Sequence, residues 1–148
     1  MSDELFGANN LIDVELFYIV EKNAHGVPRI TILSDEDAFT MKADEKQKDK
    51  VKCIKSKWRL PTWQGSNELL KRSTVYNFQK QESEVDWTMY RDARLKTCLV
   101  EWDIKDSAGN PVPLTETTID NLHANIAMAM LLKYDTTVSP GKEESIKN

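Results

Sequence analysis

The stretch from Lys57 to Trp102 constrains the fold most, because it holds all four tryptophans of the 148-residue chain. A tryptophan side chain buries about 150–250 Å². We therefore expect these four side chains to dominate the hydrophobic core. The stretch opens with the end of a strand, which Pro61 stops. Thr62 can then accept a hydrogen bond from the first turn of a following helix.

A first helix is predicted over residues 63–80 from its composition. Gly65 and the run 73–75 lower its helical propensity. Its apolar side chains form a broad stripe and are Trp63, Leu69, Leu70, Val75, Tyr76 and Phe78. A polar break is expected at residues 81–85.

A second helix is predicted over residues 86–103, with Ser83 or Asp86 as its N-cap. It has the clearest amphipathic pattern in the chain. Its apolar side chains recur at spacings of three and four residues, with Arg91 as the polar exception. They are Trp87, Leu95, Cys98, Leu99 and Trp102.

The beginning of the chain is predicted to be rich in β-structure. Residues 13–20 and 28–33 contain many branched and aromatic side chains, and a turn signal at 23–26 separates them. These two strands form a predicted β-hairpin. Residues 34–49 are highly charged, and we expect a loop or mobile arm there, with room for one helical turn beginning at Ser34.

A third strand is predicted over residues 50–60, and lysines cover one of its faces. This strand lies in a basic band: residues 41–60 carry eight bases and three acids, whereas residues 1–40 carry two bases and eight acids. Lysine on an edge strand discourages pairing with other chains, which is the simplest interpretation of the band. Two alternatives stay open, namely contact with an acidic partner and binding of nucleic acid.

The end of the chain is predicted to be helical. A turn is expected at residues 104–113, and Thr115 should cap a short helix at 116–121. The last helix is predicted over residues 122–134, with one apolar face formed by Ile126, Ala127, Met130, Leu131 and Tyr134. A disordered tail is expected at residues 135–148.

These elements predict an α+β fold with an N-terminal β-hairpin plus a third strand, followed by a small bundle of three to four α-helices. A chain of this length usually forms one domain. We expect a single α+β domain over residues 1–134. It would comprise a strand-rich front at 1–60, which includes the charged arm at 34–49, and a helical part at 61–134.

Composition predicts a soluble protein of a reducing compartment. The net charge of −4 is mild and gives no general attraction to nucleic acid or to an anionic membrane. The acidic N-terminus does not resemble a signal peptide. No apolar run approaches the roughly 18 residues that a membrane span needs. Cys53 and Cys98 lie among apolar or helical neighbours and are expected to be free thiols.

No catalytic residue, cofactor-binding residue or metal ligand is predicted. His25 and His123 each lack a second ligand at metal-binding spacing. The loop from Asp103 to Gly109 lacks the carboxylate spacing of a calcium loop. The chain contains no phosphate-binding loop and no nucleophile motif. We therefore expect that the protein is not an enzyme.

Four segments follow one another from Trp58 onward. They are a helix start W-x-x-P-T, a helix R-D-x-R-L-K-x-x-L-x-E-W, a turn G-N-P-V-P-x-T and a closing helix L-x-x-x-I-A-x-x-x-L-x-K-Y-D. This succession, over about residues 57–135, resembles the tail assembly chaperones of tailed bacteriophages. The first 56 residues carry no such resemblance.

The resemblance implies a non-enzymatic protein of the cytoplasm of the infected bacterium. Proteins of that family bind the tape measure protein, keep its long apolar helical surface soluble and promote assembly of the tail tube around it. They leave before the tail is complete. Some occur both in a short form and in a frameshift-extended form. The family has no catalytic residues to carry over to this chain.

Four side chains are candidates for contact with an amphipathic partner helix, because they lie off the regular stripe of the second predicted helix. They are Trp63, Leu70, Tyr76 and Tyr90. Ordinary core packing is the alternative for each of them.

Two other functions are kept open. One is a structural virion protein of the tail, baseplate or connector, which would use the hairpin and the charged arm to hold neighbouring subunits by strand addition. The other is a nucleic-acid-binding regulator that uses the basic band at 42–59, although nucleic acid is not the favoured partner. No cofactor and no membrane are expected, and self-association into a homo-oligomer is compatible with all three functions.

Overall fold

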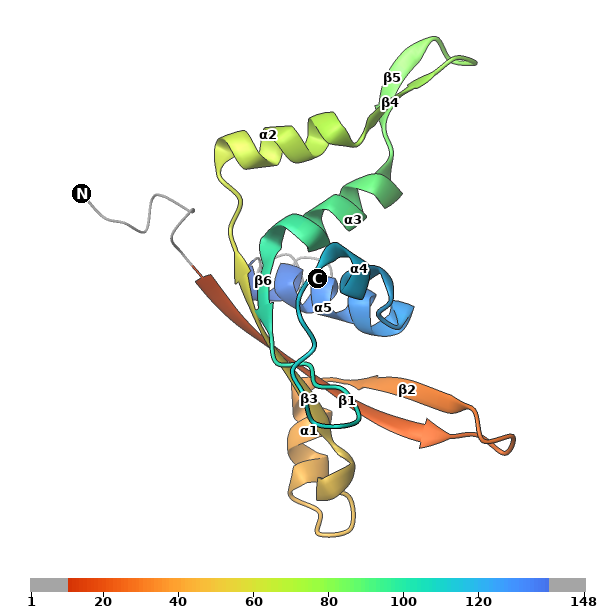
Figure 1. Cartoon of the computed structure of the whole chain (residues 1–148), viewed down its shortest axis with the longest axis vertical. Helices are drawn as coiled ribbons and strands as arrows, with labels where there is room; N and C mark the ends of the chain where they lie inside the picture. The colour runs from red at the N-terminus through yellow and green to blue at the C-terminus, as the bar shows by residue number, and fades with distance from the viewer. Residues whose placement is uncertain (1–10, 139–148) are drawn as a thin grey trace, which may run out of the picture. The chain divides into compact units, whose positions relative to one another are not determined.

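The computed structural model describes residues 11–138 and has an α+β fold (Figure 1). The chain forms two compact units. In the described residues, the first unit comprises 11–12 and 57–101, and the second comprises 13–56 and 102–138. The predicted division at residue 60 does not coincide with the boundary between these units. The single domain expected over residues 1–134 stays a prediction.

A four-stranded sheet has the strand order β2-β1-β3-β6. The first two strands, β1 (Leu11–Lys22) and β2 (Pro28–Leu33), pair antiparallel from Phe17 opposite Leu33 to Lys22 opposite Pro28. The predicted hairpin is therefore confirmed. Its turn is closed by the Asn23 side-chain oxygen, which accepts hydrogen bonds from the His25 and Val27 amides.

The third predicted strand is also confirmed, as β3 (Lys52–Arg59). Ile54, Ser56 and Trp58 are buried, and the alternate side chains, which are Lys55, Lys57 and Arg59, are exposed. The basic face is therefore real, but its interpretation as an edge strand is wrong. β3 lies between β1 and β6, so pairing on both sides already protects its backbone.

The charged segment after β2 is mostly helical, so the prediction of a loop or mobile arm is wrong there. Helix α1 (Asp35–Lys42) begins at its N-cap Ser34, whose Oγ accepts a hydrogen bond from the Asp37 amide at 3.1 Å. Three acidic residues in the first turn complement the helix dipole. The short 3₁₀ helix η3 (Lys48–Lys50) follows. These local caps outweigh the weak apolar pattern of the segment.

The first long helix is shorter than predicted. Helix α2 (Trp63–Arg72) has the expected N-cap Thr62, but it ends before Ser73. Residues predicted as the rest of the helix and the polar break instead form an antiparallel hairpin of β4 (Thr74–Asn77) and β5 (Glu82–Val85). Branched and aromatic residues after Ser73 favour extended structure, which explains the difference.

The second predicted helix is confirmed from its N-cap onward and wrong at its end. Helix α3 (Trp87–Cys98) has Asp86 as its N-cap, whose side chain accepts hydrogen bonds from the Thr88 and Met89 amides. Leu99–Trp102 is strand β6. Directly after it, the Asp103 amide donates to the Lys55 carbonyl at 3.0 Å, so pairing at the sheet replaces the helical hydrogen bonds here.

The C-terminal helices follow the prediction closely. Thr115 caps α4 (Glu116–Asp120) through a capping box. The last helix, α5 (Ala124–Val138), buries Ile126, Met130, Leu131 and Tyr134 along one face. The helix continues to Val138, so the disordered tail predicted from residue 135 is wrong for residues 135–138. The remainder of that tail, 139–148, lies outside the described residues.

The tryptophans do not share one core, which corrects the expectation drawn from their clustering. Trp58 is 0% exposed, whereas Trp63 is 83% and Trp87 is 66% exposed. Trp102 is half-buried, and its Nε1 donates a hydrogen bond to the Val112 carbonyl at 2.7 Å. Much of the buried set is aliphatic and comes from β1, β3 and α5.

Candidate partner-binding surface

The first unit concentrates the exposed apolar side chains of the molecule. More than half of the large apolar side chains that are exposed in residues 11–138 fall between Trp63 and Met89. We call these the exposed apolar set: Trp63, Leu70, Val75, Tyr76, Phe78, Trp87 and Met89. Single exposed apolar residues are normal in soluble proteins, but several large ones in one short stretch indicate an interaction site.

Helix α2 presents its part of the set on one stripe. Trp63 and Leu70 are seven residues apart, which is two helical turns, so their side chains project in nearly the same direction. Leu69 is turned toward the interior and is 2% exposed. The stripe of Trp63 and Leu70 is therefore separate from the side of α2 that packs inside the unit.

The β4–β5 hairpin carries the next part. The rings of Tyr76 and Phe78 lie edge to face, with centroids 4.8 Å apart. Opposite Tyr76 stands Ser83, which is too small to cover it. Phe78 is 83% exposed. The Ser73 hydroxyl donates to the Leu69 carbonyl, and the Asp86 amide donates to the Ser73 carbonyl, so both ends of the hairpin are fixed to the helices.

Helix α3 contributes a short aromatic row. The rings of Trp87 and Tyr90 meet edge to face at 5.4 Å, and the Arg94 guanidinium lies 5.7 Å from the Tyr90 ring centroid. These spacings of three and four residues place all three side chains along one side of the helix. Tyr90 is half-buried by this row, while Trp87 remains exposed.

Three of the four side chains predicted from the sequence belong to the exposed apolar set, namely Trp63, Leu70 and Tyr76. The fourth, Tyr90, is half-buried and contacts the Trp87 ring edge to face. Sequence reasoning missed Val75, Phe78, Trp87 and Met89. For Trp87 the helical pattern was misleading, because its stripe continues into the buried residues Leu95 and Cys98.

The basic band at 42–59 is interrupted by acids. Lys48 pairs with Glu45 at 3.3 Å, and Lys42 Nζ lies over the Phe17 ring at 4.1 Å. The pKa of the Cys53 thiol on β3 is raised above its ordinary value of 9.0 by burial, and further by Glu15 and Asp103. Carboxylates therefore lie beside the lysines of the band, which weakens its attraction for a polyanion.

Tyr18 titrates in the same surroundings. Burial raises the pKa of its phenol above the ordinary value of 10.0, and Asp103 and Cys53 add to the increase. Both Tyr18 and Cys53 therefore hold their protons at neutral pH, where neither is an activated nucleophile. Within residues 11–138, no group of three or more His, Cys, Asp or Glu side chains is placed to hold a metal ion. Cys53, which is half-buried, and Cys98, which is buried, are free thiols in the structure.

The helices of the described chain are each too short or too polar to cross a membrane. No family model, curated protein or solved structure matches the chain. The resemblance to tail assembly chaperones therefore stays a prediction. The surface of the first unit can make apolar and aromatic contacts, and both acidic and basic side chains lie near it.

Proposed function

We propose that this chain is a non-enzymatic binding protein of phage tail assembly, a chaperone that holds the apolar helical surface of a tape measure protein while the tail tube assembles. The exposed apolar set in the first unit is the observation that carries the proposal. Covering one large apolar side chain is worth about 1.5–3 kcal/mol. Several such side chains can therefore supply substantial binding energy without any chemistry.

The shape of the set favours a helical partner. An amphipathic helix presents anchors at spacings of three, four and seven residues. Trp63 and Leu70 on α2 repeat that spacing, and Trp87 and Tyr90 do so on α3. Met89 adds a flexible side chain, 44% exposed, of the kind that adapts to varied apolar surfaces. A long tape measure helix would fit such a surface. The binding would take place in the cytoplasm of the infected bacterium.

Several of the charged side chains near the exposed apolar set are paired or act as caps within the first unit. Asp92 pairs with Lys96 at 3.0 Å, Lys80 pairs with Glu84 at 3.7 Å, and Asp86 caps α3. Local pairing of this kind leaves the apolar side chains as the main source of affinity. Binding by this surface should therefore depend little on salt concentration.

The two alternatives have less support. A structural virion protein would hold its neighbours by strand addition with both the hairpin and the charged arm. The hairpin is present, but residues 35–42 of the arm form α1 and are not extended. A nucleic-acid-binding regulator needs an uninterrupted basic surface, whereas Glu45 lies within the basic band and Glu15 and Asp103 lie near Cys53 on β3.

The test is affinity purification of the tagged chain from infected cells, followed by mass spectrometry. The variant Trp63→Ser/Phe78→Ser/Trp87→Ser removes the most exposed aromatic rings of the set. The matched control Val27→Ser/Phe39→Ser removes exposed apolar side chains outside it. We expect the wild type and the control to retain a long helical tape measure protein, and the triple variant to lose at least tenfold of it.

Purified virions provide the second half of this test. A chaperone should be captured from infected cells and be missing from finished particles. Recovery of the chain in stoichiometric amounts from virions would favour the structural alternative. Equal capture of the tape measure protein by the wild type and the triple variant would exclude the exposed apolar set as the binding site.

A further inference from the structure

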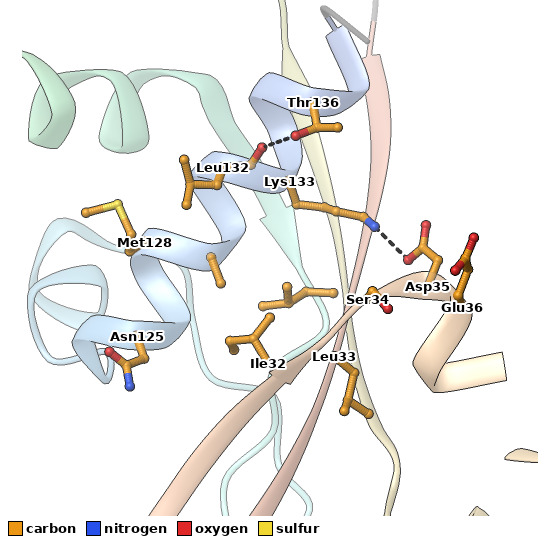
Figure 2. A pocket seen from close by; sticks show the side chains of 12 residues that line it. Ile32, Leu33, Ser34, Asp35, Glu36, Asn125, Met128, Leu132, Lys133 and Thr136 are labelled. Atoms are coloured by element: carbon orange, nitrogen blue, oxygen red, sulfur yellow. Dashed lines mark hydrogen bonds and ion pairs between the residues drawn. The ribbon is translucent and has the colours of Figure 1, made fainter. Parts of the chain in front are cut away.

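A groove in the second unit lies between α5 and the end of β2 and has a volume of about 730 Å³ (Figure 2). Its apolar lining comes from Leu16 on β1, Ile32 and Leu33 on β2, and Met128 and Leu132 on α5. Leu132 is 56% exposed, so part of this lining faces solvent. The polar rim includes Asp35, whose Oδ1 accepts a hydrogen bond from Lys133 Nζ at 2.6 Å (Figure 2).

One edge of β1 beside this groove has no partner strand in the described chain. β2 pairs with β1 only from Phe17 to Lys22, because the chain leaves the sheet at Ser34 to form α1. The other neighbour of β1 is β3. The edge of residues 13–16 on the β2 side is therefore open. An open edge offers regularly spaced backbone donors and acceptors to an extended segment of another chain.

The side chains of this edge alternate in character. Val14 and Leu16 are buried, and Leu16 lines the groove. Asp13 and Glu15 are exposed on the opposite face. Side chains of paired strands that stand opposite each other lie on the same face. An added strand would therefore place alternate side chains in the groove and the others beside the two carboxylates.

A second copy of this chain fits the edge poorly. Two copies of this edge could pair antiparallel with their buried side chains on the same face. Over residues 13–16, such a pairing places two acidic side chains opposite each other: Asp13 opposite Asp13, Asp13 opposite Glu15, or Glu15 opposite Glu15. Like charges directly opposite each other destabilise a strand pair. Glu36 at the groove rim adds further negative charge. The charge pattern thus selects a partner with basic residues.

We propose that the open edge of β1 at residues 13–16 and the groove beside α5 bind an extended segment of a partner protein, in which apolar residues alternate with lysine or arginine. The backbone edge would supply hydrogen bonds, Leu16 and Leu132 would contact the apolar side chains, and Asp13 and Glu15 would attract the bases. This site is independent of the exposed apolar set and of the chaperone function proposed for it.

The test uses two capped six-residue peptides, one alternating valine with lysine and one alternating valine with glutamate. Binding to the full chain is measured by isothermal titration calorimetry, and exchange of the backbone amides of residues 13–16 by NMR. We expect the lysine peptide to bind at least tenfold more tightly than the glutamate peptide. We also expect it to slow exchange at residues 13–16.

The variant Asp13→Lys/Glu15→Lys should invert the preference, so that the glutamate peptide binds more tightly. Misfolding cannot produce such an inversion. Leu132→Gln should weaken the lysine peptide severalfold, and the control Glu68→Lys, on α2, should leave both affinities within twofold of the wild type.

Three results would overturn the proposal. The first is that neither peptide binds, and the second is that both bind equally to the wild type. The third is that the chain self-associates through this edge, shown by dimerisation in analytical ultracentrifugation that Asp13→Lys/Glu15→Lys changes.

Discussion

Helices α5 and α3 carry similar apolar spacings and use them differently. In α5 the stripe is buried from Ile126 to Tyr134. In α3 only the C-terminal end of the stripe, Leu95 and Cys98, is buried, whereas Trp87 at its other end is exposed. The same pattern of three- and four-residue spacings therefore leads to core packing in one helix and partly to open surface in the other.

The difference shows that an amphipathic stripe predicts contact but does not identify the contacting chain. α5 has few charged residues, its apolar face is buried, and it contacts β2. α3 mixes aromatic side chains with Arg91, Asp92, Arg94 and Lys96, and part of its apolar stripe is exposed. We propose that the exposed part of the α3 stripe binds another protein.

The largest expected effect compares one methionine in each helix. Met130 in α5 is 0% exposed, and Met89 in α3 is 44% exposed. Met130→Ala should lower the free energy of unfolding by about 2–5 kcal/mol, because it leaves a cavity. Met89→Ala should change it by less than about 0.5 kcal/mol. Urea unfolding followed by circular dichroism measures both. Similar losses for the two variants would break the comparison.

The next effect tests how α3 is fixed at its exposed end. Asp86→Ala removes the N-cap that accepts hydrogen bonds from the Thr88 and Met89 amides, and it should cost about 1 kcal/mol. Asp86→Asn, which keeps an equally good cap, should stay close to the wild type. The same urea titration applies. If both variants lost stability equally, the charge and not the cap would fix the helix start.

A smaller effect on stability is expected from the exposed tryptophans. Trp63→Ser/Trp87→Ser should change the free energy of unfolding by less than about 1 kcal/mol, since both side chains are mostly in solvent. The double variant should bind less of the dye anilinonaphthalene sulfonate, because exposed apolar surface binds that dye. Unchanged dye fluorescence would show that the dye site lies elsewhere.

The smallest expected effect concerns the titration and reactivity of the Cys53 thiol in the second unit. The Cys53 pKa is raised, so the folded chain holds this proton at pH values where the unfolded chain releases it. The contribution of Cys53 to the free energy of unfolding should be fully present below pH 9.0 and should decrease as the pH rises above that value. Iodoacetamide labelling of Cys53, followed by mass spectrometry, should be slow at pH 7.5 and increase at higher pH. Fast labelling at pH 7.5 would reveal an activated thiol.

Much of the fold could be predicted where local signals and tertiary packing agree. The two strands of the β1–β2 hairpin are rich in branched side chains and flank a turn that contains Asn23 and Gly26. Thr115 is a strong helix cap. At Leu99–Trp102, by contrast, the helical spacing continues but the chain pairs with the sheet. Pairing with a distant strand is invisible to a local pattern, so this boundary could not be predicted.

The candidate site could be predicted only in part. The aromatic content of residues 57–102 pointed to the region that contains the exposed apolar set, and three of the four predicted contact residues are exposed. Burial depends on which neighbours cover a side chain. Trp58 and Trp63 show this most clearly, because they are five residues apart and at opposite extremes of exposure. The groove beside α5 combines three distant segments, so no local pattern reveals it.

Hydroxyl-radical footprinting of the purified chain, read by mass spectrometry, tests the central claim most directly. We expect rapid oxidation of Trp63, Phe78, Trp87 and Met89, and strong protection of Trp58 and Met130. Protection of Trp63 and Trp87 to the level of Trp58 would mean that the aromatic side chains are already covered within the chain, and the proposed binding surface would not exist.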